Sequence, residues 1–287
     1  MSAVTTNLSR IVLFSALVLA VLHTAARAQS SSAQISVSKE NVSSSSSAKK
    51  WGLTAVLTQS TNLEESSSRT DETSTTLELL PTFRLSSKST LRVYTPIENN
   101  NSTNETLLLN TVVSFLRDPI VLNSSNKLNL ELKALLPTDE AAREEQSLQG
   151  ALGFVASVRH QLKTSRPSSI SYGLDAYKFS HEFDRSNSRT ANISHRLRHI
   201  VSYDLGLTQK LALNLKGYYQ TGFTYQNVIK ETFLLEQSLD YSLNTNLAFG
   251  LSHSNQGALF EKNGADFNAS FYDSRDSSIS AYVTFIY

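Results

Sequence analysis

The residues Leu148–Leu162 alternate between apolar and polar character along their whole length. In a β-strand, side chains two positions apart share a face, so Leu152, Phe154 and Val158 line one face and Arg159 lies on the other. A strand of a soluble sheet is usually about 5–6 residues long, whereas a strand that crosses a bilayer at a tilt needs about 9–11. This run therefore predicts a strand that is long enough to cross a membrane.

The same alternation recurs from Trp51 onward, in runs separated by turn residues, and a first run begins near Trp51 itself. We count thirteen candidate strands. A single-chain barrel normally has an even number, so we assign Ala265–Tyr272 to an outer loop and expect twelve strands, with ten or fourteen as alternatives. Pro81 removes a ladder donor from its run, and a phase change between Ala176 and Tyr177 predicts a bulge. The other runs are Leu77–Leu85, Leu91–Ile97, Leu107–Phe115, Leu128–Leu136, Leu148–Leu162, Ile170–Phe183, Ile193–Leu207, Leu211–Phe223, Phe233–Leu243, Leu247–His253 and Ile279–Tyr287.

The last run ends on an aromatic residue and carries apolar residues at alternate positions, namely Ile279, Ala281, Val283, Phe285 and Tyr287. This pattern resembles the carboxy-terminal signature of bacterial outer-membrane β-barrels, a resemblance to the porin-like class with no motif of a particular family. It implies an all-β, antiparallel up-and-down transmembrane barrel whose last strand closes on the first. It also implies that these five residues form an assembly signal, that the protein lies in the Gram-negative outer membrane, and that its partners are the barrel-assembly machinery, membrane lipid and lipopolysaccharide.

The amino-terminal part predicts export. Residues 1–28 have the features of a secretory signal peptide, with the apolar stretch Ile11–Leu22 and a small-residue site before Gln29. The apolar stretch is shorter than the roughly 20 residues that a membrane-spanning helix needs. Residues 29–50 are rich in serine and predict a flexible leader, so we place the barrel at 51–287.

Composition excludes several classes of protein. Without Arg10 and Arg27 of the signal peptide, the mature chain has 24 basic and 25 acidic residues, and it contains no basic run that would suggest nucleic-acid binding. The absence of cysteine excludes disulfides and thiolate metal ligands. Beyond the signal peptide no stretch of 18 apolar residues predicts a membrane-spanning helix.

Charged residues at the polar positions of the runs are expected to line the lumen. A twelve-stranded barrel lies between the filled eight-stranded and the wide sixteen-stranded barrels, so it can hold a narrow polar pore. The leading prediction is a porin-like diffusion channel for small polar or charged solutes, in which Arg196 and Arg198 attract carboxylates or phosphates. The predicted pore-lining residues are Glu78, Arg84, Arg92, Glu131, Lys133, Arg159, Arg196, Arg198, Lys216, Glu236 and Asp240.

The alternative is a structural, adhesive or surface-recognition barrel, in which the same charges pair across the lumen and plug it. Its polar loops at 98–105 and 184–191 would then bind partners. An outer-membrane hydrolase is the least favoured alternative, because the chain has no Gly-x-Ser-x-Gly motif. His195 and His199 fall on the apolar positions, so we expect them near the membrane interface or above it. We therefore expect no enzyme, no cofactor and no metal site.

Overall fold

The computed structural model describes residues 50–63, 73–101, 103–260, 268–273 and 277–287. The predicted signal peptide (1–28) and nearly all of the predicted leader (29–50) lie outside these residues and stay predictions. Among the described residues, no helix is long and apolar enough to cross a membrane.

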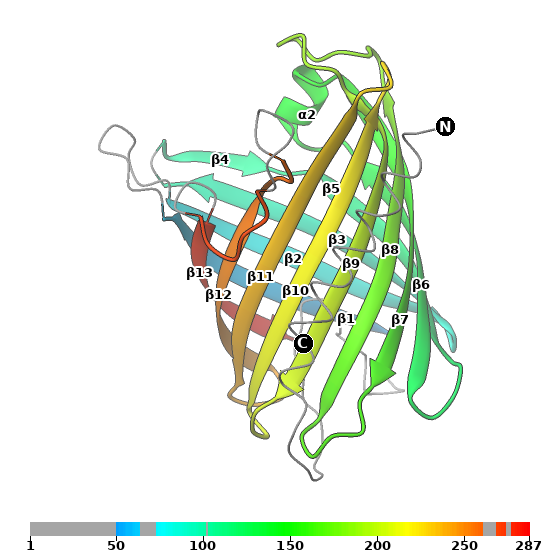
Figure 1. The fold of residues 1–287 in the computed structure, drawn as a ribbon, viewed down its shortest axis with the longest axis vertical. Helices are drawn as coiled ribbons and strands as arrows, with labels where there is room; N and C mark the ends of the chain where they lie inside the picture. The colour runs from blue at the N-terminus through cyan, green and yellow to red at the C-terminus, as the bar shows by residue number, and fades with distance from the viewer. Residues whose placement is uncertain (1–49, 64–72, 102, 261–267, 274–276) are drawn as a thin grey trace.

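The described residues form one antiparallel sheet that closes into a barrel of twelve strands, with one short strand added at its rim (Figure 1). The fold class and the strand number expected from the sequence are therefore confirmed. The strands are β1 (Trp51–Asn62), β2 (Thr73–Ser86), β3 (Ser89–Asn100), β4 (Glu105–Leu108), β5 (Thr111–Val121), β6 (Asn126–Leu136), β7 (Leu148–Gln161), β8 (Ser168–His181), β9 (Ile193–Gly206), β10 (Leu211–Thr224), β11 (Ile229–Ser242), β12 (Leu247–Ala258) and β13 (Ser277–Ile286).

The last strand closes on the first, as the sequence predicts. β13 pairs with β1 over nine residue pairs, from Thr54 opposite Ile286 to Asn62 opposite Ser278. The pairing continues past the last assigned strand residue, because the Tyr287 amide donates to the Leu53 carbonyl at 2.8 Å. The rings of Trp51 and Tyr287 lie 5.1 Å apart at this seam.

The thirteenth strand is not where the sequence suggested a surplus run. The run Leu107–Phe115 is broken at Leu109, so that its first part belongs to β4, which pairs only with β3, and its second part belongs to β5. Of Ala265–Tyr272, residues 265–267 lie outside the described residues, and 268–272 contain no strand. The assignment of that run to a loop therefore agrees with the residues that can be seen.

The bulge predicted between Ala176 and Tyr177 is wrong. β8 keeps one register with both β7 and β9 through this point. The phase change arises because Tyr177 is an aromatic residue on the inner face, where its ring lies against Gly153, while Lys178 takes the outward position. Pro81 pairs with Leu53 of β1 but makes no ladder pair with β3, and the β2–β3 register is the same on either side of it.

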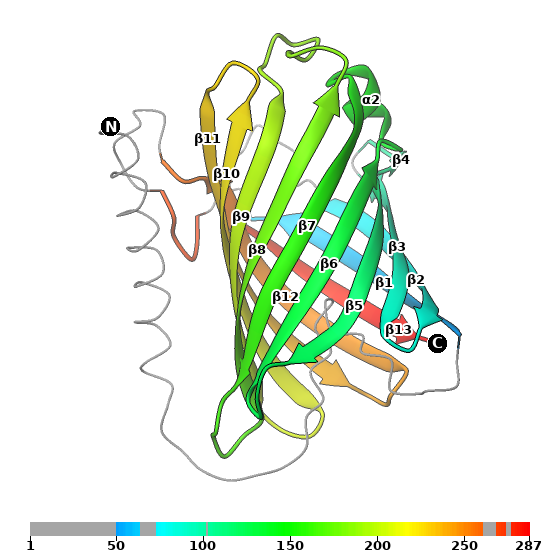
Figure 2. The same cartoon turned by 90° about the vertical axis from the view of Figure 1, so that its right-hand side faces the viewer.

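The connections at the two ends of the barrel differ in length. At one end, here called the turn end, strands are joined by the short segments 87–88, 122–125, 162–167, 207–210 and 243–246. At the opposite end, the loop end, the β6–β7 connection contains the short helix α2 (Glu140–Glu144), capped by Asp139. Asn187 of the β8–β9 connection binds the carbonyls of Glu144 and Glu145, both at 2.8 Å, so that two loops form one rim (Figure 2).

The outer surface of the wall is apolar and exposed. Leu152 is 72%, Leu251 59% and Leu132 56% exposed, and each lies on the outward face of its strand. In β8 the alternation is complete from Tyr172 to Ser180, with every second residue exposed. A water-soluble sheet would cover such a belt, whereas a bilayer solvates it.

Candidate functional site

The inner face of the barrel is the candidate functional surface. Because outward positions are fixed by the exposed leucines, the alternate positions point into the lumen. The cross-strand register brings these inner residues together: in the ladder, Tyr177 lies opposite Arg196, Asp175 opposite Arg198, and Arg198 opposite Gln220. The inner wall therefore places charged, aromatic and amide side chains from β8, β9 and β10 next to one another.

Two arginines of β9 form the most basic part of this wall. The Arg198 guanidinium donates to Gln220 Oε1 from Nε (3.0 Å) and Nη2 (2.6 Å), and its Cζ lies 4.2 Å from the centre of the Tyr218 ring. Among the described residues, no carboxylate lies within ion-pair distance of Arg198. A neutral amide and an aromatic face hold this guanidinium in place without cancelling its charge.

The neighbouring Arg196 is only weakly neutralised. Its Nη2 lies 3.9 Å from Asp175 Oδ2, at the limit of an ion pair, and its Cζ lies 4.6 Å from the centre of the Tyr177 ring. Arg196 Nε and Asp175 Oδ1 are both buried, and neither has a hydrogen-bond partner. Two guanidinium groups and one carboxylate leave a net positive charge at this level of the lumen.

The remaining ion pairs run along the wall. Arg92 of β3 binds Glu131 of β6 at 2.9 Å, and Lys133 lies 3.8 Å from the same carboxylate. Arg84 of β2 binds Asp118 of β5 at 2.7 Å and also donates to the carbonyls of the β2–β3 turn, so it lies at the turn end of the barrel. The Arg92 and Arg84 pairs each join strands two places apart in the sheet, and Lys133 lies on the same strand as Glu131. Such pairing fixes the wall and does not need a side chain to cross the lumen.

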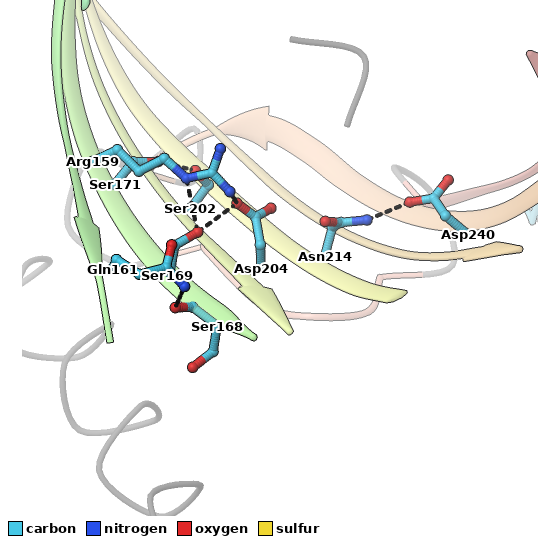
Figure 3. A network of polar contacts seen from close by, with 9 residues as sticks. All are labelled: Arg159, Gln161, Ser168, Ser169, Ser171, Ser202, Asp204, Asn214 and Asp240. Carbon is cyan, nitrogen blue, oxygen red and sulfur yellow. Dashed lines mark hydrogen bonds and ion pairs between the residues drawn. The ribbon is translucent and has the colours of Figure 1, made fainter. Parts of the chain in front are cut away.

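A polar network lines the inner face near the turn end (Figure 3). Arg159 of β7 binds Asp204 of β9 at 3.1 Å, and Ser169 of β8 lies between them, accepting from Arg159 Nε at 3.0 Å and donating to Asp204 at 3.0 Å. Farther along the wall, Asn214 donates to Asp240. The network satisfies the charges of Arg159 and Asp204 through each other, as a buried pair requires.

Two tyrosine rings, those of Tyr177 and Tyr282, lie against glycines of a neighbouring strand. A Cβ atom at Gly153 would be 2.7 Å from the Tyr177 ring, and one at Gly250 would be 2.1 Å from Tyr282 Cζ. The Tyr282 hydroxyl donates to Asp240 Oδ1 at 2.5 Å, so this ring is held at both ends. The glycines leave room for each ring against the wall instead of in the lumen.

The structure places the predicted pore-lining residues as follows. Lys216 faces Glu236 across β10 and β11, and Glu78 accepts from the Tyr94 hydroxyl at 2.9 Å. Their role in lining a pore stays a prediction. Sequence reasoning missed the acidic partners Asp175 and Asp204; the latter is in phase with both arginines on β9, and this phase is the signal that could have identified it.

His195 and His199 lie on the outer face, as the apolar phase predicts. The His199 ring stacks on Tyr219 at 6.1 Å, and its Nδ1 lies 2.8 Å from the Tyr172 hydroxyl. His195 lies 3.0 Å from the Ser194 hydroxyl, which itself donates to the Phe223 carbonyl. In the described ranges, no group of three histidine, aspartate or glutamate side chains could hold a metal ion.

The fold is similar to that of outer-membrane channels of known structure. An outer membrane channel from Pseudomonas putida F1 is similar with a TM-score of 0.56 and 12% identity, over 83% of this chain and 95% of that one. The NanC porin is similar with a TM-score of 0.53 and 10% identity, over 81% of this chain and 98% of that one. No family model matches the sequence. No curated protein matches it either. At these identities the similarity establishes the fold alone, a closed antiparallel β-barrel like those of these outer-membrane channels.

Proposed function

We propose that this chain is an outer-membrane β-barrel of Gram-negative bacteria whose lumen is a narrow diffusion channel for small polar or charged solutes, with a preference for anions. The apolar belt supports the location, and the polar inner wall supports the passage of polar solutes. The observation that carries the anion preference is the Arg198 guanidinium, which faces the lumen and has no described carboxylate as a partner.

The geometry of the wall favours an open lumen over a plugged one. The ion pairs and the Arg159 network connect strands that are close neighbours in the sheet, and the Tyr177 and Tyr282 rings lie along the wall. Inner-face hydroxyls line part of the wall and pair with each other, such as Ser60 with Ser280 at 2.8 Å. All of these contacts join strands that are at most two places apart in the sheet, so none of them needs a side chain to cross the lumen.

Planar-bilayer recording of the refolded protein tests this proposal. We expect stable conductance steps and, in a salt gradient, a reversal potential that reports anion preference. A silent protein that nevertheless migrates as a folded barrel would refute the channel and favour the structural or adhesive barrel with a plugged lumen. The proposal involves no catalytic step.

Charge variants then test the site. Two unit charges 4 Å apart interact with an energy of about 1 kcal/mol in water and about 4 kcal/mol near a protein surface, and salt reduces both energies. We therefore expect Arg198→Gln to lower the anion-to-cation permeability ratio by about two- to tenfold. Asp175→Asn removes the carboxylate beside Arg196, so it should raise the same ratio.

The matched control is Lys178→Gln, which removes one positive charge from the outward face of β8. This change should leave the permeability ratio unchanged. An equal effect of Lys178→Gln and Arg198→Gln would show that net charge, and not a luminal site, sets the selectivity.

A further inference from the structure

A segment between β12 and β13 folds back over the outside of the barrel. We name Asn268–Asp273 the outer segment; Figures 1 and 2 show it in orange, outside the wall formed by the strands. The Asn268 amide donates to the Leu259 carbonyl at 2.9 Å, next to the end of β12. Farther along, Ser270 accepts from Asn255 Nδ2 at 2.8 Å, and the Tyr272 ring stacks on His253 at 6.2 Å. The segment therefore runs back along β12 from the loop end toward the apolar belt.

The outer segment covers a part of the wall that does not suit a lipid surface. Asn255 and His253 are in phase with the exposed Leu251, so they occupy outward positions on β12. Beneath the segment Asn255 is 0% exposed, and its amide is bound to Ser270 through Nδ2. An amide facing hydrocarbon without a partner would cost several kcal/mol. The segment thus replaces lipid at a polar position of the wall.

Apolar contacts hold the segment on the wall. Phe233 is 1% exposed although it occupies an outward position on β11, and it packs with Tyr219 and Leu259 in a small core. Phe260 and Ala269 pack against this core from the connection. The cluster is an outer core built on the barrel wall, and it fixes the height at which the segment lies.

The segment presents two adjacent aromatic side chains to the surroundings. Phe271 and Tyr272 are each 58% exposed. Tyr272 lies at the level of His253, whose cross-strand partner is the outward-facing Ile279 and whose next outward neighbour is Leu251. The aromatic pair therefore stands at the upper border of the apolar belt. At such borders aromatic rings partition into the headgroup region of a bilayer.

We propose that the outer segment anchors this side of the barrel in the headgroup region of the outer leaflet, through the rings of Phe271 and Tyr272. The partner is a lipid surface, recognised by an aromatic pair beside a belt of aliphatic side chains. This anchoring does not depend on conduction through the lumen.

Tryptophan fluorescence tests the proposal. Trp51 is the only tryptophan, so Trp51→Phe gives a silent background for Phe271→Trp, with Tyr272→Trp as a second reporter. The proteins are refolded into phosphatidylcholine vesicles that carry shallow brominated acyl chains, and heat-modifiable migration verifies that each one has folded. Leu251→Trp serves as the lipid control, and Val228→Trp, in the β10–β11 connection at the loop end, serves as the water control.

We expect the brominated lipid to quench Phe271→Trp at least about twofold more strongly than Val228→Trp, and we expect iodide to quench it less. Iodide quenching of both segment reporters equal to that of Val228→Trp would overturn the proposal. The proposal would also be overturned if both segment reporters were protected from iodide and from the brominated lipid, and if this protection were lost when the protein is diluted in the bilayer. That result would identify a contact between two copies of the chain.

Discussion

The substitution Gly250→Ala should force the Tyr282 ring away from the barrel wall. The added Cβ would lie 2.1 Å from Tyr282 Cζ and 2.5 Å from its hydroxyl oxygen, whereas an ordinary contact is 3.4 Å or more. The ring must therefore move by about 1.3 Å, the difference between 3.4 and 2.1 Å. Overpacking of this kind costs about 1–3 kcal/mol, and loss of the Tyr282–Asp240 hydrogen bond adds a similar amount.

Two measurements follow the displaced ring. Urea unfolding of the refolded barrel should show a loss of about 2–6 kcal/mol in the free energy of unfolding. Single-channel conductance should fall by about 1.5- to 2-fold if the ring enters a bore of intermediate width. Tyr282→Ala frees the space that the alanine needs, so the double variant Gly250→Ala/Tyr282→Ala should regain conductance. Gly217→Ala is the matched control, because its Cβ would lie 3.2 Å from the flexible end of Leu235 and at an ordinary 3.6 Å from the Leu234 carbonyl oxygen.

The reasoning is refuted if the double variant conducts no better than Gly250→Ala alone. In that case the alanine would act on the backbone and not through the ring. A coupling energy near zero in the double-mutant cycle of unfolding free energies would lead to the same conclusion.

Three further outcomes are expected. Arg159→Met should destabilise the barrel by about 1–3 kcal/mol in urea unfolding, because it leaves the Asp204 carboxylate without its ion pair. The double variant Arg159→Met/Asp204→Asn should recover part of that loss, and no recovery would argue against a stabilising ion pair. Deleting Phe285–Tyr287 should impair insertion into the outer membrane more than any single loop change, because it removes the residues that pair with Ala55 and Leu53 of β1. Equal amounts of folded protein in a fractionation assay would contradict this prediction. Finally, the folded protein should migrate faster than the boiled protein on a gel, and a soluble, heat-insensitive band would contradict the barrel.

Most of the fold could be predicted from the sequence, because alternation in a membrane barrel is dictated by the solvent on each side of the wall. The lipid requires apolar residues at every second position, as at Leu128–Leu136, and the closing pair of strands was predicted from the terminal pattern. The alternation was misleading where an aromatic residue faces inward. Tyr177 mimics a lipid-facing residue, and its contacts with Gly153 and Arg196, which belong to other strands, show the opposite direction.

The site could be predicted less completely. Phase alone puts Arg196 and Arg198 on the inner face, but it does not show which charges meet. Arg159 binds Asp204 across an intervening strand, and this contact depends on the stagger of three strands, which no single run determines. The outer segment could not be predicted either, because its packing on β11 and β12 requires the wall to exist first.

The seam between β1 and β13 has a consequence for how the protein folds after its synthesis. Leu53 and Tyr287, which bond to each other there, are far apart in the sequence, so the first strand has no lasting neighbour on one edge until β13 has been synthesised. Until that moment the unpaired edge is a template for wrong pairing and aggregation. The barrel can consequently close only in a late step, when β13 meets β1, and the pairing of these two strands decides whether the sheet is complete.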